Sequence, residues 1–405
     1  MDRRDFLIKG AAMASWLLAT ALPRSAAAKK NLIEKSPNAD LYRIDAYCHF
    51  STMDIIQDLE DIVNGRRPLK APKFEHVFRK LFEGTPALID PVKRIKKMDK
   101  NGIDMSILVP LPWVETIPAK AIADNSESAF AAVRKINNDL AKIVASHPDR
   151  FRAVALLPTW DKEQMIAEFR RAVKELGMVG GFFICGYTAK RPDHEHYFNL
   201  DKNKNDNLYA EAVKLDVPLW LHPSTPPIIA DYQDEENPPP PAPQNRVSKY
   251  QIWQGLTWLH DSSAAMVRMV FAGVFKKHPE LKMIIHHHGA LIPMYHHRMT
   301  YGWDYFEQAS GVSYDKNVSK PYMDHFKNFY CDTATQGHDP KLLQIALDFF
   351  GPEKLLFGTD APMDATGGDL FTRGARASVE ALAISPEDLK KIYSGNIARL
   401  ISLKL

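Results

Sequence analysis

The sequence predicts an α/β protein built as a single (β/α)8 TIM barrel. Eight short apolar runs typical of strands alternate with segments whose apolar residues recur at helical spacing. Side chains able to bind a metal or move a proton stand at the ends of several of these runs. The C-terminal ends of the strands carry the active site in barrels of this kind. The chain has 405 residues, 45% of them hydrophobic, enough for one large core.

The strand pattern fixes the expected order of the barrel. Strands are expected at Leu41–Phe50, Met105–Leu111, Phe151–Pro158, Val179–Cys185, Val217–His222, Lys282–His288, Asn328–Thr333 and Lys354–Asp360. Amphipathic helices are expected at Glu163–Leu176, Leu208–Lys214, Ala264–Lys277 and Pro340–Phe350. An open doubly wound sheet is the alternative, because the same alternation of elements would also produce it.

Three connections on the active-site side of the predicted barrel are long. They cover residues 51–95 after the first strand, 112–130 after the second and 224–250 after the fifth. The last contains a proline-rich tract over 237–243, which is stiff and cannot pair into a sheet. It is either a lid or wall over the site, or a surface excursion or subunit contact.

The first 28 residues are typical of an export signal. Arg3 and Arg4 precede an apolar run over Gly10–Leu22, and Ala26–Ala28 supplies small residues for cleavage. The pattern resembles a twin-arginine signal, and it predicts export to the periplasm by the twin-arginine machinery. An uncleaved membrane anchor is the alternative, although the apolar run is shorter than the roughly 20 residues that span a bilayer.

The expected domain organisation is a signal over residues 1–28, a flexible lead-in over 29–40 and one barrel over 41–405. Without residues 1–28, 48 basic residues stand against 47 acidic ones. No basic patch is visible, which argues against a nucleic-acid partner. The three cysteines lack the number and spacing of a disulfide framework or a thiolate metal site, so buried packing is expected for them. They are Cys48, Cys185 and Cys331.

Residues at strand ends predict a metal site. His49, His222 and Asp360 end the first, fifth and eighth runs, and Asp332 ends the seventh. Two imidazoles and a carboxylate suit Zn, Mn or Fe, with water in an open position. Residues two apart on a strand share a face, so Tyr47 is expected beside His49.

A run of three histidines, 286–288, ends the sixth predicted strand. If Ile285 points into the barrel, the strand period turns His287 inward, where it is a candidate general acid or base, and turns His286 and His288 outward. Arg298 could bind a substrate carboxylate in a bidentate contact, or form a salt bridge on a helix surface. Structural or surface roles are expected for the other histidines of this region, His286, His288, His296 and His297.

Several ordered motifs resemble the amidohydrolase-related family, which includes aminocarboxymuconate-semialdehyde decarboxylase and the resorcylate decarboxylases. They cover nearly all of residues 41–405. The motifs are His147–Arg152 with Leu157 and Pro158, Glu175–Gly180, Leu215–Pro223, Gly273–Lys282 continuing to His287 and Gly289, Phe357–Pro362, and Gly395–Asn396 with Arg399 and Leu400.

The resemblance implies a role for each site residue. His222 and Asp360 would bind a divalent metal, usually Zn or Mn, and His287 would serve in catalysis. His49 matches the second ligand of the strand-one motif, but Tyr47 departs from the histidine or glutamate at the first. A phenol with a pKa near 10 is a poorer ligand, so Tyr47 would either bind the metal weakly or hydrogen-bond substrate or water. A homodimer is also implied.

Three functions follow from these expectations. The first is non-oxidative decarboxylation of a small carboxylated aromatic or enol compound, with Asp360 or His287 protonating the carbon that loses CO2. The second is hydrolysis of a lactone, amide or C–C bond by metal-activated water. The third is a non-catalytic periplasmic binding protein, which only the Tyr47 departure favours. Fold alone does not choose between the first two.

Overall fold

The computed structural model describes residues 41–52, 83–112, 126–184, 206–223, 252–314 and 316–405. The expected export signal, the lead-in, the proline tract and Cys185 lie outside these residues, as do most of the three long connections. Among the described helices, none is both long and apolar enough to cross a membrane.

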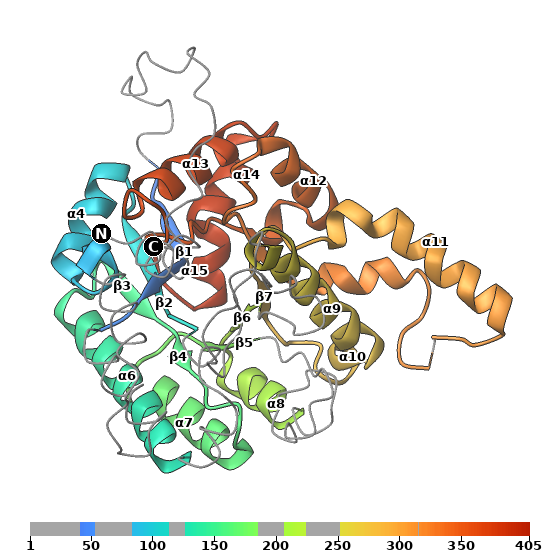
Figure 1. The fold of residues 1–405 in the computed structure, drawn as a ribbon, viewed down its shortest axis with the longest axis horizontal. Coiled ribbons are helices and arrows are strands. Elements are labelled where there is room, and N and C mark those ends of the chain that lie inside the picture. Colours follow the sequence, from blue (N-terminus) through green and yellow to red (C-terminus); the bar gives the residue numbers. More distant parts are fainter. Residues whose placement is uncertain (1–40, 53–82, 113–125, 185–205, 224–251, 315) are drawn as a thin grey trace, which may run out of the picture.

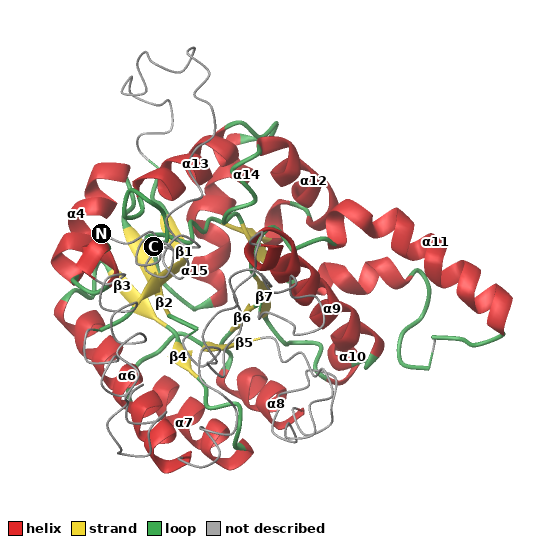
Figure 2. Ribbon diagram, viewed as in Figure 1, coloured by secondary structure: helices red, strands yellow, loops and turns green. Residues whose placement is uncertain are grey.

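Two parallel sheets form the centre of the molecule, and helices surround them (Figures 1 and 2). The three-stranded sheet contains β1 (Ile44–Phe50), β2 (Met105–Pro110) and β3 (Phe151–Ala153) in that order. The six-stranded sheet contains, in order, β4 (Ala155–Leu156), β5 (Gly181–Ile184), β6 (Leu219–His222), β7 (Met283–Ile285), β8 (Tyr330–Asp332) and β9 (Leu355–Leu356). Each of the eight predicted runs contains a strand, and the third is divided into β3 and β4 at Val154.

Backbone hydrogen bonds connect the two sheets at both ends. Val154 N donates to Leu108 O over 3.2 Å beside the division between β3 and β4. At the other end, Ala46 N donates to Phe357 O over 2.7 Å, and His49 N donates to Ala361 O over 2.8 Å. The first strand therefore lies beside the segment that follows the last strand.

The helices lie outside the strands, as parallel sheets require (Figure 2). The α-helices are α4 (Pro91–Asn101), α6 (Ser126–Ser146), α7 (Lys162–Lys174), α8 (Asp206–Leu215), α9 (Trp258–Phe271), α10 (Val274–Lys277), α11 (Ile292–Ser310), α12 (Pro340–Phe350), α13 (Asp369–Glu380), α14 (Pro386–Lys390) and α15 (Asn396–Leu400). Short 3-10 helices are η1 (Pro86–Leu88), η6 (Tyr322–Asn328) and η7 (Pro352–Lys354), and π-helices are η5 (Trp253–Thr257) and η8 (Lys391–Gly395).

One predicted helical stretch, Ala264–Lys277, is divided into α9 and α10. The division falls at Gly273, whose φ of +72° is a left-handed conformation that favours glycine. A Cβ atom at this position would meet Asn317 Cβ at 2.9 Å. The amphipathic pattern continues across the division, so apolar spacing alone could not reveal it.

Asp369 connects α13 to α4 and so joins the late part of the chain to the early part. Its Oδ2 accepts hydrogen bonds from Lys100 Nζ at 2.6 Å, and Lys97 Nζ lies 3.0 Å away. Its Oδ1 accepts from Asn101 Nδ2 at 2.8 Å. Burial would raise the pKa of Asp369, but these donors lower that pKa to about 2.

We expect Asp369→Asn to reduce stability at neutral pH by about 1–2 kcal/mol, because two lysines lose their shared carboxylate. The depressed pKa means that this contribution is present above about pH 4 and is lost as the pH falls towards 2. The measurement is urea unfolding of wild type and variant between pH 7 and pH 2.5, with Asp149→Asn, an exposed aspartate, as control. If wild type and Asp369→Asn differed in free energy of unfolding by the same amount at pH 7 and at pH 2.5, the stabilising role of the ionised Asp369 would be contradicted.

Candidate functional site

Four buried side chains converge where the strands end: His49 on β1, His222 on β6, His286 after β7 and Asp360 after β9. The Oδ1 atom of Asp360 lies 3.3 Å from His49 Nε2 and 3.5 Å from His286 Nε2. The His222 ring lies beside them, with its centroid 5.6 Å from that of His49 and 5.9 Å from that of His286. Three of the four were predicted for this site, and the structure brings those three together.

The three imidazoles turn the same nitrogen toward this centre. In each ring the Nδ1 atom lies against an oxygen acceptor outside the centre, which places a proton on Nδ1 and leaves Nε2 to face inward. The acceptors are Pro110 O for His49 (3.3 Å), Pro223 O for His222 (2.5 Å) and Asp332 Oδ2 for His286 (2.6 Å). Nε2 atoms that face an ionised carboxylate make the centre attractive to a positive charge.

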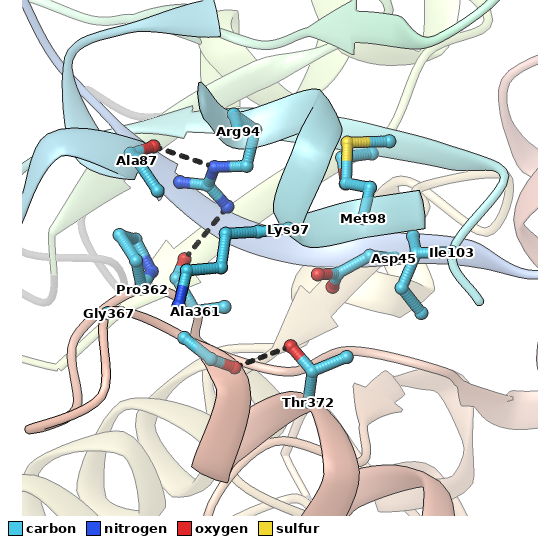
Figure 3. A pocket seen from close by; sticks show the side chains of 12 residues that line it. Asp45, Ala87, Arg94, Lys97, Met98, Ile103, Ala361, Pro362, Gly367 and Thr372 are labelled. Carbon is cyan, nitrogen blue, oxygen red and sulfur yellow. Dashed lines mark hydrogen bonds between the residues drawn. The ribbon is translucent and has the colours of Figure 1, made fainter. Parts of the chain in front are cut away.

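The buried Arg94 holds the end of β1 in place. Its Nε donates to Ala87 O over 2.8 Å and its Nη1 to Ala361 O over 3.4 Å, and its Nη2 donates to His49 O. Figure 3 shows the first two of these bonds at the wall of a small cavity between α4, β1 and α13. Asp45 and Thr372 also line this cavity. It contains none of the four convergent side chains, so it lies apart from them.

A tight backbone turn positions Asp360. Its φ of +60° is a left-handed conformation that is strained for this residue type, and its N–H donates to Tyr47 O over 2.9 Å. Thr359 is held by Asp45, whose carboxylate accepts from the Thr359 N–H at 3.0 Å and from the hydroxyl at 2.6 Å. Burial would raise the pKa of Asp360, but His286 and His49 hold that pKa well below its ordinary value. Asp360 is therefore ionised at neutral pH.

The three consecutive histidines do not follow the strand period. Strand β7 ends at Ile285, and His287 and His288 have φ values of +62° and +58°, so the alternation of faces stops before them. The expectation that His286 points away from the site was wrong. His288 is fully buried, with Nε2 3.2 Å from Thr333 O, so it has a structural role and not a surface one.

Asp332 fixes this turn. Its Oδ1 accepts from the backbone N–H of His287 at 3.1 Å and of Ala334 at 3.0 Å, and its Oδ2 lies against His286. The Asp332 carbonyl also accepts from His288 N at 3.0 Å. Burial would lower the pKa of His286, but Asp332 and then Asp360 raise it to about 9. A positive charge at His286 Nε2, as a proton or a metal ion, is therefore favoured.

His287 lies beside the centre and not within it. Its ring packs 3.6 Å from the His286 ring, and the Trp258 ring lies nearly parallel to it at 6.4 Å. Burial, and then the charge of His286, lower the pKa of His287 well below its ordinary value, so it is neutral at neutral pH. Its Nδ1 has no hydrogen-bond partner among the described residues. The assignment of His287 as acid or base stays a prediction.

Tyr47 is fully buried beside the centre, as expected for a residue two before His49. Its ring stacks on His286, with centroids 3.7 Å apart and planes 12° apart, and it meets the His49 ring edge-on at 5.5 Å. The ring supports two of the converging imidazoles. The doubtful role of the Tyr47 oxygen as a ligand or as a substrate contact stays a prediction.

Other predicted residues lie away from the centre. Arg298 is exposed on α11, and its substrate contact stays a prediction. His297 is exposed on the same helix, and His296 Nδ1 lies 2.7 Å from Pro293 O. The remaining two cysteines are buried and unpaired, as expected: Cys48 and Cys331.

The sequence matches the model of the family described as Amidohydrolase over residues 44–403. The chain belongs to the amidohydrolase family. Its resemblance to the decarboxylase branch is supported by curated relatives. It is 30% identical over 318 residues to gamma-resorcylate decarboxylase of Rhodococcus jostii, covering 76% of this chain and 87% of that protein. It is 25% identical over 277 residues to 2-amino-3-carboxymuconate-6-semialdehyde decarboxylase of Dictyostelium discoideum, covering 67% of each.

A solved structure supports the fold of this amidohydrolase. The dihydroxybenzoic acid decarboxylase of Polaromonas sp. JS666, with bound manganese and the inhibitor 2-nitroresorcinol, superposes with a TM-score of 0.64 at 26% identity. The match covers 90% of this chain and 97% of that one. Together with the curated relatives, it confirms the prediction of an enzyme.

The donors of this amidohydrolase suit a metal ion in chemistry, and their separations are close to those of coordinated donors. With bonds of about 2.1 Å, two donors on a tetrahedral ion are roughly 3.4 Å apart, and two coordinated imidazole centroids roughly 5–5.5 Å. The observed separations are 3.3 and 3.5 Å from Asp360 to two histidines, and 5.6 and 5.9 Å between ring pairs. No three of the described His, Cys, Asp or Glu side chains can hold an ion as they stand. The two centroid separations exceed the expected range by a few tenths of an ångström, a difference that small side-chain movements would remove.

Sequence reasoning missed three contributors to this site. His286 was given a structural or surface role, and Asp332 was noted only as the end of a strand. A carboxylate and a histidine at the ends of adjacent strands were the available signal for that pair. Trp258, whose ring lies 5.5 Å from the His222 ring, begins α9, before the predicted helical stretch starts at Ala264.

We expect Gly289→Ala to destabilise the enzyme by about 2–4 kcal/mol. Gly289 follows the histidine turn with a φ of +74°, and a Cβ there would meet the Phe350 ring at 2.5 Å. The control is Gly302→Ala on α11, where a Cβ meets nothing within 4 Å and alanine should be neutral or slightly stabilising. Urea unfolding measures both, and equal stabilities for the two variants would contradict the expected strain.

Proposed function

We propose that this amidohydrolase is a metal-dependent, non-oxidative decarboxylase, a carbon–carbon lyase acting on a small carboxylated aromatic or enol compound. The observation that carries the proposal is the buried meeting of inward-facing Nε2 atoms with the ionised Asp360. The decarboxylases among its relatives support the reaction, and the manganese in the Polaromonas enzyme supports Mn or Zn as the metal.

The proposed metal would be held by His49, His222 and Asp360, and it would supply a positive charge that binds substrate oxygens beside the leaving carboxylate. The reaction breaks the bond between the ring or enol carbon and the carboxylate, and a C–H bond replaces it. One proton is consumed and CO2 is released, so no oxidant or reductant is required.

His287 is better suited than Asp360 to deliver that proton. Asp360 is ionised and lies between two imidazoles, so it has no proton to give at neutral pH. His287 is neutral and adjacent to the centre, and its Nδ1 has no hydrogen-bond partner in the described part of the chain. A proton taken up there from solvent would be held weakly, which makes the protonated ring a strong acid toward carbon.

The test is an assay of the metal-loaded enzyme on a panel of hydroxybenzoates, carboxylated enols and lactones. We expect CO2 release without added oxidant, and we expect His287→Gln to lower kcat by about 10²–10⁴-fold while metal content is unchanged. His297→Gln, an exposed histidine on α11, is the control and should retain full activity.

Other results would identify the alternatives. Ring opening or water addition without CO2 release would indicate a hydrolase or a related enzyme. Saturable binding of panel members without turnover by the metal-loaded protein would indicate a binding protein. Either result would contradict the proposed decarboxylase.

We also propose that the enzyme is exported to the periplasm by the twin-arginine machinery. Arg3 and Arg4, the apolar run and the alanines before residue 29 support this. We expect the double variant Arg3→Lys and Arg4→Lys to accumulate in the cytoplasm, because paired arginines are the recognised feature. Cell fractionation measures the distribution, with Lys9→Arg as control, and undiminished export of the double variant would contradict the route.

We further propose that the two sheets form one closed eight-stranded barrel. The backbone bonds of Ala46 to Phe357 and of Val154 to Leu108 support this, since they bridge the two gaps between the sheets. A crystal structure with a break in backbone pairing beside β1 would contradict it.

A further inference from the structure

We infer that His286 is a ligand of the metal, so that the site has three histidines and one aspartate. This inference rests on the proposed metal dependence of the enzyme. It gives a role to a residue that the strand-one and strand-six motifs do not assign, in a chain where Tyr47 stands at the first strand-one ligand position.

The His286 ring is positioned so that its Nε2 atom is available to a metal. Its Nδ1 is engaged by Asp332 at 2.6 Å, so only Nε2 is available, and that atom is buried without a hydrogen-bond partner among the described residues. Nε2 lies 3.5 Å from Asp360 Oδ1, close to the 3.3 Å between the same oxygen and His49 Nε2. His286 and His49 are thus nearly equivalent with respect to Asp360. The His222 ring lies 5.6 Å from the His49 ring and 5.9 Å from the His286 ring, so a metal held by His49, His222 and Asp360 would lie beside His286.

Asp332 makes with His286 the kind of contact that metal-bound histidines commonly have. Metal-bound histidines commonly donate their other N–H to a carboxylate, which fixes the ring and strengthens the donor. Asp332 is fully buried and is itself fixed by backbone N–H groups of His287 and Ala334. The neighbouring histidines lack this arrangement. His288 bonds a carbonyl through Nε2, and His287 Nδ1 has no partner among the residues that the structure describes.

The Tyr47 ring holds His286 in the orientation that a metal ligand needs. Its stacking on His286, at 3.7 Å and 12°, fills the space beside the imidazole and restricts its rotation. The aromatic ring thus serves the site by packing, and the nitrogen of His286 supplies the donor. A tyrosine at this position is then compatible with tight metal binding, because the phenol oxygen is not required.

The test is a titration of metal-free protein with Mn²⁺ alone, in which the EPR signal of unbound Mn²⁺ reports occupancy. We expect His286→Ala to weaken Mn²⁺ binding by roughly 100-fold or more, and Asp332→Asn by about 10–100-fold, the range typical of supporting partners. Tyr47→Phe, which keeps the ring, should remain within about threefold of wild type, as should the control His288→Ala from the same turn.

A measurement on the unaltered enzyme covers the case in which His286→Ala does not fold. In the Co²⁺-loaded wild type, each coordinated histidine contributes one contact-shifted Nδ1–H signal to the proton NMR spectrum. We expect three such signals, and two would overturn the assignment. Wild-type Mn²⁺ affinity in a folded His286→Ala variant, or loss of binding in Tyr47→Phe, would overturn it equally.

The outcomes separate this inference from the proposed reaction. An enzyme that releases CO2 but shows two histidine signals loses only the His286 assignment. A protein with three signals that never releases CO2 loses only the decarboxylase proposal. A wild type that binds neither Mn²⁺ nor Co²⁺ overturns both.

Discussion

The buried carboxylate of Asp332 is the interaction on which the site depends. The carboxylate accepts one hydrogen bond from the His286 ring and two from backbone N–H groups. The backbone carbonyl of Asp332 also accepts a hydrogen bond from the His288 N–H. These bonds hold a turn in which two non-glycine residues have positive φ. An ionised group without its partners in this interior would be costly, of the order of several kcal/mol. The turn and the carboxylate are therefore stable only together.

This turn determines the electrostatics of the whole centre. It brings His286 to the same Asp360 oxygen that His49 approaches. Asp360 then lies against the His49 and His286 rings, and Asp332 lies against His286, while the neighbouring His286 and His287 differ in charge. The pKa of His286 is raised to about 9, while burial and that neighbouring charge depress the pKa of His287. The two adjacent histidines therefore differ in charge: His286 favours a positive charge, and His287 is a neutral base.

Much of the fold and part of the site could be predicted from the sequence. Apolar runs identified each strand that the structure describes, because strands buried on both faces leave a clear signal. The convergence of His49, His222 and Asp360 was predicted because strand ends meet at one face. The histidine turn was misread because the strand period was extended beyond Ile285, where the chain leaves the extended conformation. Positive φ at His287 and His288 depends on Asp332, which is distant in sequence and invisible to periodicity. The break at Gly273 was missed for a similar reason, since the side chain that a Cβ there would meet, Asn317, is distant in sequence.

A crystal structure of the Mn²⁺-loaded protein, with anomalous diffraction at the manganese edge, tests the central claim most directly. The account predicts one anomalous peak with His49 Nε2, His222 Nε2, His286 Nε2 and an Asp360 oxygen each within about 2.0–2.4 Å, typical ligand distances. It also predicts Asp332 still bonded to His286 Nδ1. A peak bound by the Tyr47 oxygen with His286 turned away, or no peak at this centre, would contradict it.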